Sequence, residues 1–113
     1  MDISVEKKGS VVVLKLKGDL DSQTVSFFKK KSSDLVDGGA VKFVLDATEL
    51  SFVDSLGLGA MISLLRRVRE QKGDVKIFGL TDDVKEIFEI TRLGKLFDVC
   101  SSSKEAVEKY EGH

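Results

Sequence analysis

The stretch FVDSLGLGAM, residues 52 to 61, places an acid and a hydroxyl, Asp54 and Ser55, just before two glycines. A serine there can act as a nucleophile, a helix cap or an acceptor of phosphate. The ordinary interpretation is a cap, because Asp and Ser are both favoured at helix N-termini. The apolar spacing that follows predicts a helix, and a glycine inside a helix costs about 1 kcal/mol relative to alanine. Gly57 and Gly59 therefore need a physical reason.

Nucleophilic catalysis by Ser55 finds no support elsewhere in the chain. A serine nucleophile needs a base to take its proton, most often a histidine. The single histidine, His113, is the last residue. Val53 stands two positions before Ser55, so the G-x-S-x-G elbow of hydrolases is absent as well. We expect no enzymatic activity.

Asp46 offers one enzyme-like alternative. It ends the apolar run VKFVLD, as the phosphoacceptor aspartate does in response-regulator receivers, and Asp19 and Asp21 follow an earlier strand. Receivers, however, begin with a strand and a helix, whereas this chain begins with two strands. A turn or cap role for Asp46 is the preferred interpretation. A nucleotide-binding module is a further alternative, but LGLGAM is only a fragment of the glycine-rich phosphate loops.

The composition is that of one globular domain. The chain has 113 residues, of which 42% are hydrophobic and 33% charged, enough for one core. Eighteen basic and nineteen acidic residues leave a net charge of -1, whereas nucleic-acid binders carry a basic surplus. The basic runs at 29–31 and 66–69 fall in the second half of predicted helices, where cations complement the helix dipole. We expect no nucleic-acid partner.

No membrane, disulfide or metal signal is visible. No segment approaches the roughly 18 apolar residues of a membrane span, and residues 1–8 lack the apolar region of a signal peptide. Cys100 is the only cysteine, so a disulfide framework and a thiolate metal cluster are both excluded. We expect a cytoplasmic protein without metal or cofactor.

The elements that position Asp54 and Ser55 can be read from periodicity. Strands at 2–8 and 11–17 flank Gly9-Ser10, a pair that suits a type II′ hairpin. A helix follows from about 22 to 37, capped by Asp21 or Ser22. The pattern then predicts a strand at 41–47, a helix at 55–72, a strand at 75–79, a helix at 81–90, a strand at 96–100 and a final helix with a capping box at Ser102-x-x-Glu105.

The order β-β-α-β-α-β-α-β-α predicts an α/β fold. Alternation after the first hairpin calls for right-handed crossovers and a mostly parallel sheet with helices packed against it. Functional loops in such sheets lie at the carboxyl ends of the strands. Asp54 and Ser55 follow the strand at 41–47 by a short link, which puts them at that edge.

Three stretches resemble the bacterial anti-sigma factor antagonists, the founding members of the STAS domain family. GDLD at 18–21 is similar to the family's G-E/D-L-D. LDATELSFVDSLGLGAM at 45–61 is similar to its L-D-L-x-x-(V/L)-x-(F/Y)-(M/V)-D-S-(S/T)-G-L-G signature. Residues 80–99 resemble its helix followed by a Leu-Gly/Phe turn. The resemblance covers nearly the whole chain, so we expect residues 1–113 to form a single STAS domain.

The resemblance implies a small regulator that works by partner switching. It would bind an anti-sigma factor, itself a Ser/Thr protein kinase, and so release a sigma factor. That kinase would inactivate the antagonist by phosphorylating Ser55, and a PP2C-type phosphatase would reset it. ATP and Mg²⁺ would belong to the kinase, so the chain itself needs no cofactor. Leu56 departs from the Ser or Thr that often follows the acceptor, which leaves the kinase specificity open.

The predicted partner surface surrounds Ser55. Tight packing of the helix start against a neighbouring strand is one explanation of the two glycines, but we interpret them as giving a kinase access to the hydroxyl. We expect one of the two neighbouring leucines to face inward and the other the partner. A STAS scaffold or interaction module in a signalling assembly is the alternative function. The predicted partner contacts are Asp19, Asp21, Asp54, Leu56, Gly57, Leu58 and Gly59.

Overall fold

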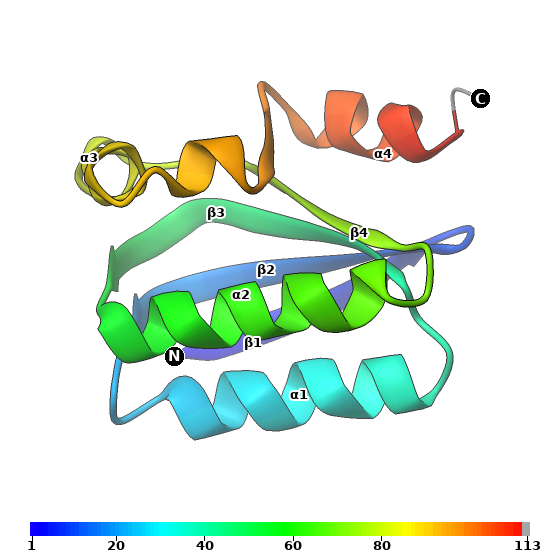
Figure 1. Ribbon diagram of the computed structural model, residues 1–113, viewed down its shortest axis with the longest axis horizontal. Coiled ribbons are helices and arrows are strands. Elements are labelled where there is room, and N and C mark those ends of the chain that lie inside the picture. Colours follow the sequence, from blue (N-terminus) through cyan, green and yellow to red (C-terminus); the bar gives the residue numbers. More distant parts are fainter. Residues whose placement is uncertain (112–113) are drawn as a thin grey trace.

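Five strands form a single sheet whose spatial order repeats their order along the chain, β1-β2-β3-β4-β5 (Figure 1). The structure is a computed structural model that describes residues 1–111. The first two strands are antiparallel, and each later strand is added parallel to its neighbour. The mostly parallel sheet with an N-terminal hairpin is thereby confirmed. The strands are β1 (Asp2–Lys8), β2 (Val11–Leu20), β3 (Lys42–Val53), β4 (Asp74–Phe78) and β5 (Asp98–Cys100).

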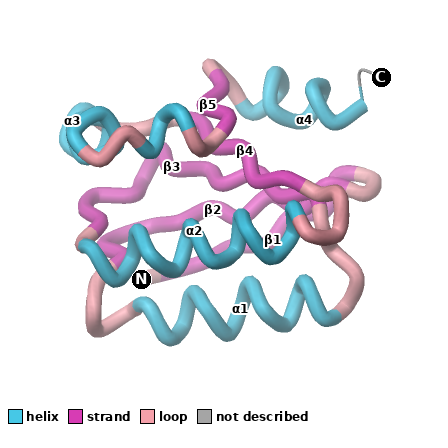
Figure 2. The backbone as a smooth tube through the Cα atoms, in the orientation of Figure 1, coloured by secondary structure: helices cyan, strands magenta, loops and turns pink. Residues whose placement is uncertain are grey.

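Helices connect the strands and cover both faces of the sheet (Figure 2). α1 and α2 lie side by side along one face, whereas α4 packs on the opposite face (Figure 1). α3 packs against β3. The helices within residues 1–111 are α1 (Val25–Asp37), α2 (Ser55–Arg69), α3 (Asp82–Ile90) and α4 (Ser103–Glu111), with a 3₁₀ turn at Leu93–Lys95.

The core has two layers because side chains alternate across the central strands. On β2, Leu14 and Leu16 face α1 and α2 and are fully buried. Val13 faces the other way and packs with Val107 of α4. A strand covered on both faces reads as a continuous apolar run, which is why VVVL and KFVL were recognisable as strands.

The β1–β2 hairpin has the predicted two-residue loop. Lys8 pairs with Val11, leaving Gly9 and Ser10 as the turn. Gly9 has φ of +63°, while Ser10 has a negative φ. This combination is that of a type II′ turn, whose first central residue must tolerate positive φ.

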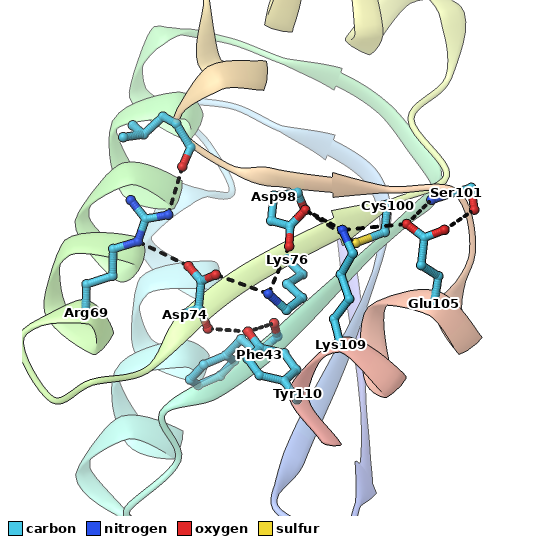
Figure 3. A network of polar contacts seen from close by, with 11 residues as sticks. Phe43, Arg69, Asp74, Lys76, Asp98, Cys100, Ser101, Glu105, Lys109 and Tyr110 are labelled. Carbon is cyan, nitrogen blue, oxygen red and sulfur yellow. Dashed lines mark hydrogen bonds and ion pairs between the residues drawn. The ribbon is translucent and has the colours of Figure 1, made fainter. Parts of the chain in front are cut away.

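α4 is attached to the sheet by polar contacts as well as by its apolar side chains (Figure 3). Lys76, almost fully buried on β4, donates to Asp98 on β5 at 2.9 Å. Lys109 on α4 donates to the other oxygen of the same carboxylate, also at 2.9 Å. The Tyr110 hydroxyl lies 2.6 Å from the carbonyl oxygen of Asp74 on β4 and 2.8 Å from that of Phe43 on β3, and its one hydrogen is shared between these two acceptors. Groups on three strands therefore hold the last helix.

α1 begins at Val25, later than the predicted start near residue 22. The Asp21 Oδ1 atom accepts hydrogen bonds from the N–H groups of Gln23 at 3.0 Å and Thr24 at 3.2 Å. An Asp side chain that bonds to its own backbone two residues on closes a turn. The helix is entered from Thr24, whose side chain makes no capping bond. The predicted cap at Asp21 or Ser22 is therefore wrong.

β3 is longer than the predicted strand at 41–47, because it continues to Val53. The second half of β3 pairs with the end of β2, in a register that closes with Leu20 opposite Val53. Register shifts between β2 and β3 break the alternation there, so the pattern of this half does not read as a strand. Asp54 consequently follows the strand directly, without the expected link.

The end of α2 differs only slightly from the prediction. The helix ends at Arg69 rather than near residue 72. Gly73 is required by close packing, since a Cβ atom there would collide with the Val41 carbonyl group. The basic residues at 66–69 lie in the last turn of α2 as expected, whereas residues 29–31 lie in the middle of α1.

Candidate functional site

The candidate site lies where β3 ends and α2 begins, next to the loop that joins β2 to α1. Leu20 and Val53 are neighbours in the sheet register, so the two chain segments leave the sheet side by side. The Asp54 N–H donates to the Leu20 carbonyl oxygen at 3.1 Å. The end of β2 with Asp19 and the following loop with Asp21 are thus brought to the start of α2, as predicted for the carboxyl edge of a parallel sheet.

Asp54 is the N-cap of α2. Its backbone is extended, with φ of -96° and ψ of -176°, and its Oδ1 atom accepts from the Gly57 N–H at 2.9 Å. This satisfies one of the N–H groups that a helix start leaves without a partner. The second oxygen, Oδ2, accepts from the Ser22 N–H at 3.0 Å. One carboxylate therefore bonds to both segments of the site.

Ser55 is the first residue of α2 and is exposed. Its hydroxyl makes no hydrogen bond with any other group among residues 1–111, and the capping position is taken by Asp54. The predicted cap at Asp54-Ser55 is therefore confirmed for Asp54 and wrong for Ser55. The result is an accessible hydroxyl at the positive end of a helix dipole, a place that tolerates an added anion.

The two glycines differ in their surroundings. A Cβ atom on Gly57 would collide with the Leu20 carbonyl oxygen and approach the Leu20 Cγ atom to 2.8 Å. Gly57 is buried, so it is glycine because α2 starts against the end of β2. A Cβ atom on Gly59 would meet nothing within 4 Å. The interpretation that both glycines serve access is wrong for Gly57, and for Gly59 it stays a prediction.

Leu56 and Leu58 divide as expected. Leu56 is 55% exposed at the start of α2. Leu58 is half-buried and packs against the main core. The apolar side chain available to a partner beside Ser55 is therefore that of Leu56.

The β2–α1 loop, residues 21–24, has a defined internal structure. The Thr24 hydroxyl donates to the Asp19 carbonyl oxygen at 2.8 Å, and the Asp21 N–H donates to the Thr24 oxygen at 3.0 Å. Asp21 also accepts from two N–H groups of the loop through one oxygen. Asp21 is half-buried, whereas Asp19 is exposed at the end of β2. Asp21 has a structural role here, and its role as a partner contact stays a prediction.

Asp46 does not occupy a receiver-like site. It lies inside β3 opposite Lys15, and its Oδ1 atom accepts from the Thr48 N–H at 3.0 Å and from the Thr48 hydroxyl at 2.6 Å. Asp19, by contrast, is level with Phe52 near the end of β3. No group of three His, Cys, Asp or Glu side chains among residues 1–111 is placed to hold a metal ion. His113 lies outside the described residues.

The family model of the STAS domain matches residues 2–106, almost the whole chain. The chain belongs to the STAS domain family. In addition, none of the helices in the described part of this STAS chain has the length and apolar character to cross a membrane.

Sequence relatives of this STAS domain carry regulatory names. The anti-sigma-B factor antagonist of Listeria monocytogenes is 28% identical over 102 residues, covering 88% of this chain and 90% of its own. The anti-sigma-B factor antagonist of Bacillus subtilis is 23% identical, covering 96% of this chain and 98% of its own.

Solved structures share the fold. The anti-sigma factor antagonist SpoIIAA in its unphosphorylated form superposes with a TM-score of 0.85, at 24% identity, over 99% of this chain and 98% of its own. The phosphorylated form of the Bacillus cell fate determinant SpoIIAA superposes with a TM-score of 0.75, at 23% identity, over 96% of this chain and 99% of its own. The sheet with its antiparallel first strand and its helices is therefore that of the STAS domain.

Sequence reasoning missed three residues of the candidate site. Ser22 and Thr24 build the β2–α1 loop through backbone and hydroxyl contacts. Thr24 stands three residues after Asp21, a spacing typical of a side-chain-bonded turn. Phe52 is 47% exposed on the last part of β3. If β3 had been predicted to extend to Val53, the alternation of side chains along a strand would have indicated that Phe52 points outward, because Val53 is buried.

Proposed function

We propose that this STAS protein is an anti-sigma factor antagonist of the cytoplasm. It binds an anti-sigma factor that is a Ser/Thr kinase, and binding releases the sigma factor that the kinase-type protein holds. Phosphorylation of Ser55 ends the interaction, and a PP2C-type phosphatase restores it. The observation that carries the proposal is the exposed Ser55 hydroxyl, unbonded within the described residues, directly after the capping Asp54.

The geometry at Ser55 suits a substrate rather than a catalyst. A nucleophilic serine needs a base within hydrogen-bonding reach. The side chain next to it, Asp54, already uses both oxygens on backbone N–H groups. A hydroxyl that is exposed and unpaired can instead enter the active site of another protein, which supplies the base, the metal and ATP.

The surface around Ser55 suits a protein partner. Leu56 and Phe52 expose large apolar side chains on either side of it in the sequence, 55% and 47% exposed. Asp19 adds an exposed carboxylate from the neighbouring strand end. Apolar anchors with a charged margin are the usual make-up of a specific protein interface. Asp19, Asp54 and Leu56 are our candidate contacts, with Phe52 added to them.

A negative charge on Ser55 would weaken binding at that interface. A phosphate brings about -1.5 to -2 charges at neutral pH. It would stand beside the carboxylate of Asp54, and Asp19 and Asp21 lie in the adjoining segment. A partner surface fitted to a neutral serine and to these acids would have to desolvate the phosphate without a cation to pair it.

The test is a phosphorylation assay with a kinase-type anti-sigma factor from the same organism, ATP and Mg²⁺. We expect one phosphate per chain in the wild type and none in Ser55→Ala. Ser51→Ala is the matched control, because Ser51 is also exposed and lies only four residues away on β3. It should be labelled like the wild type. Full labelling of Ser55→Ala would refute the assignment of the acceptor.

A second arm tests the partner switch. The unphosphorylated chain should bind the kinase-type protein, and a PP2C-type phosphatase should restore binding to the phosphorylated chain. The alternative function, a STAS scaffold in a signalling assembly, predicts binding that is the same before and after phosphorylation. Equal affinities of the two forms would therefore favour the scaffold.

A further inference from the structure

Asp54 connects two parts of the site that are far apart in the sequence. Its Oδ1 atom accepts from Gly57 in the first turn of α2, and its Oδ2 atom accepts from Ser22 in the β2–α1 loop, at 2.9 and 3.0 Å. Only the first of these bonds is a helix cap. The second is unrelated to the stability of α2 and ties the loop to the helix start.

The loop is ordered by its own side chains and is also bonded to the start of α2. Asp21 and Thr24 close the turn through their own side chains. Those bonds shape the loop without fixing where it lies relative to α2. Within residues 1–111 two hydrogen bonds join the segments: the Asp54 N–H donates to the Leu20 carbonyl at the strand end, and the Ser22 N–H of the loop donates to the Asp54 carboxylate.

We infer that Asp54 is a positioning residue, which holds the β2–α1 loop against α2 so that the loop and Ser55 form one surface for the partner. The partner part of this inference rests on the proposed function. The acid directly before the acceptor serine is then needed because it has two acceptor oxygens. A residue that only capped the helix would need one.

Asparagine separates the two bonds of Asp54. Asn and Asp cap helices about equally well. The Asn side chain, however, has one acceptor oxygen and a donor NH₂ group where Asp has its second oxygen. In Asp54→Asn the cap to Gly57 is kept, while the Ser22 N–H faces another donor. Asp54→Ser serves as a second variant, because serine also caps well but its one short hydroxyl cannot serve both donors.

The first measurement is NMR relaxation of the backbone of the free protein. In both variants we expect the order parameters of residues 21–24 to fall from about 0.85 to below about 0.6, while Gly57 stays rigid. Thr81→Ala is the matched control, since Thr81 caps α3 through its hydroxyl, which bonds to Val84 and Leu50 and not to residues 21–24. It should lower stability and leave residues 21–24 rigid. Rigid 21–24 segments in both Asp54 variants would overturn the positioning role.

The second measurement is affinity for the kinase-type partner. We expect Asp54→Asn to bind about tenfold more weakly and Thr81→Ala to bind like the wild type. If residues 21–24 become mobile in Asp54→Asn but its affinity for the kinase-type partner is unchanged, the partner does not contact the loop. That result would overturn the role of Asp54 in recognition. If the wild type itself fails to bind, the proposed function fails, and the relaxation data still decide whether Asp54 holds the loop.

Discussion

At the scale of single residues, Gly57 and Gly59 should respond in opposite ways to the same substitution. Gly59→Ala adds a methyl group into open space on a helix, so we expect a gain of about 0.5–1 kcal/mol in the free energy of unfolding. Gly57→Ala forces a methyl group against the carbonyl oxygen of Leu20, a fully buried residue of β2. We expect a loss of about 1–3 kcal/mol, typical of overpacking. Urea unfolding of both variants measures the difference, and a Gly57→Ala protein as stable as the wild type would contradict the packing argument.

Leu56 and Leu58 form a second informative pair. Leu58→Ala removes a half-buried side chain from the core, so it should cost about 1–2 kcal/mol of stability, less than the roughly 2–5 of a fully buried leucine. Leu56→Ala changes an exposed side chain and should shift stability by less than about 0.5 kcal/mol. Its effect should appear in partner affinity instead, as a loss of about tenfold. If Leu56→Ala left affinity intact, Leu56 would not belong to the interface.

The chemistry at Asp54 and Ser55 could be predicted because it depends on residue type and immediate neighbours. A cap and an accessible hydroxyl follow from the pair and from the helix after it. The bond from Ser22 to Asp54 could not be predicted, since it joins positions 32 residues apart. Close packing was one of the two explanations of the glycines, but that it holds for Gly57 and not for Gly59 depends on how closely α2 approaches Leu20, which the local pattern does not show.

At the scale of elements, α4 depends on a carboxylate shared by two lysines, which makes its attachment sensitive to acid. Burial alone would raise the pKa of Asp98, but hydrogen bonds from Lys76 and Lys109 outweigh it and hold the pKa below its ordinary value of 3.8. A carboxyl group with a depressed pKa stabilises the fold above pH 3.8 and loses that contribution as the pH falls through its folded pKa. Asp74, Glu105 and Cys100 also lie around this cluster (Figure 3).

Asp98→Asn isolates that contribution. We expect the variant to be about 1–2 kcal/mol less stable than the wild type at pH 6, the usual range for a bond to a charged group that is partly exposed. The gap in unfolding free energy should narrow below pH 3.8, where Asp98 of the unfolded chain takes up a proton while the folded chain does so only at its lower pKa. Urea unfolding at pH 6 and pH 3 provides the four free energies. If the difference in unfolding free energy between the wild type and Asp98→Asn were the same at pH 6 and pH 3, the charge of Asp98 would contribute nothing to the attachment of α4.

Helices and strands could be predicted where their apolar periodicity was unbroken. The prediction failed where the pairing between two strands determines how far a strand extends. The cap of α4 was predicted, and Ser102 does accept from the Glu105 N–H at 3.1 Å. The Glu105 carboxylate, however, bonds to the Ser101 hydroxyl rather than completing the box on Ser102. The second half of β3 was missed because its partner, the end of β2, shifts register beside it. Such a shift is visible only when both strands are in place.

At the scale of the whole molecule, the order of elements was sufficient to predict the architecture. Two strands followed by alternating helices and strands allow few topologies once crossovers must be right-handed. The sheet order β1-β2-β3-β4-β5 is the simplest of them. The prediction did not include how the helices are distributed over the two faces of the sheet. α4 covers a small second core, whereas α1, α2 and α3 contribute to the large one.

The switch should leave this architecture intact. Ser55 is exposed, and its side chain makes no contact that the fold requires within residues 1–111. A negative charge there meets the positive end of α2, which stabilises it by about 0.3–1 kcal/mol and offsets part of the repulsion from Asp54. Ser55→Asp should therefore unfold cooperatively within a few degrees of the wild-type melting temperature.

Binding should respond quite differently. An interface fitted to a neutral hydroxyl must desolvate the new charge among existing acids, and a loss of about 2.8 kcal/mol weakens affinity about a hundredfold. We expect that loss in Ser55→Asp and in the phosphorylated protein, while Ser55→Ala keeps the wild-type affinity. Ser51→Asp is the control, since it adds the same charge at an exposed position on β3. If Ser51→Asp weakened binding as much as Ser55→Asp, net charge rather than the position beside Asp54 would explain the effect. Equal affinity of the phosphorylated and unmodified proteins would refute the switch.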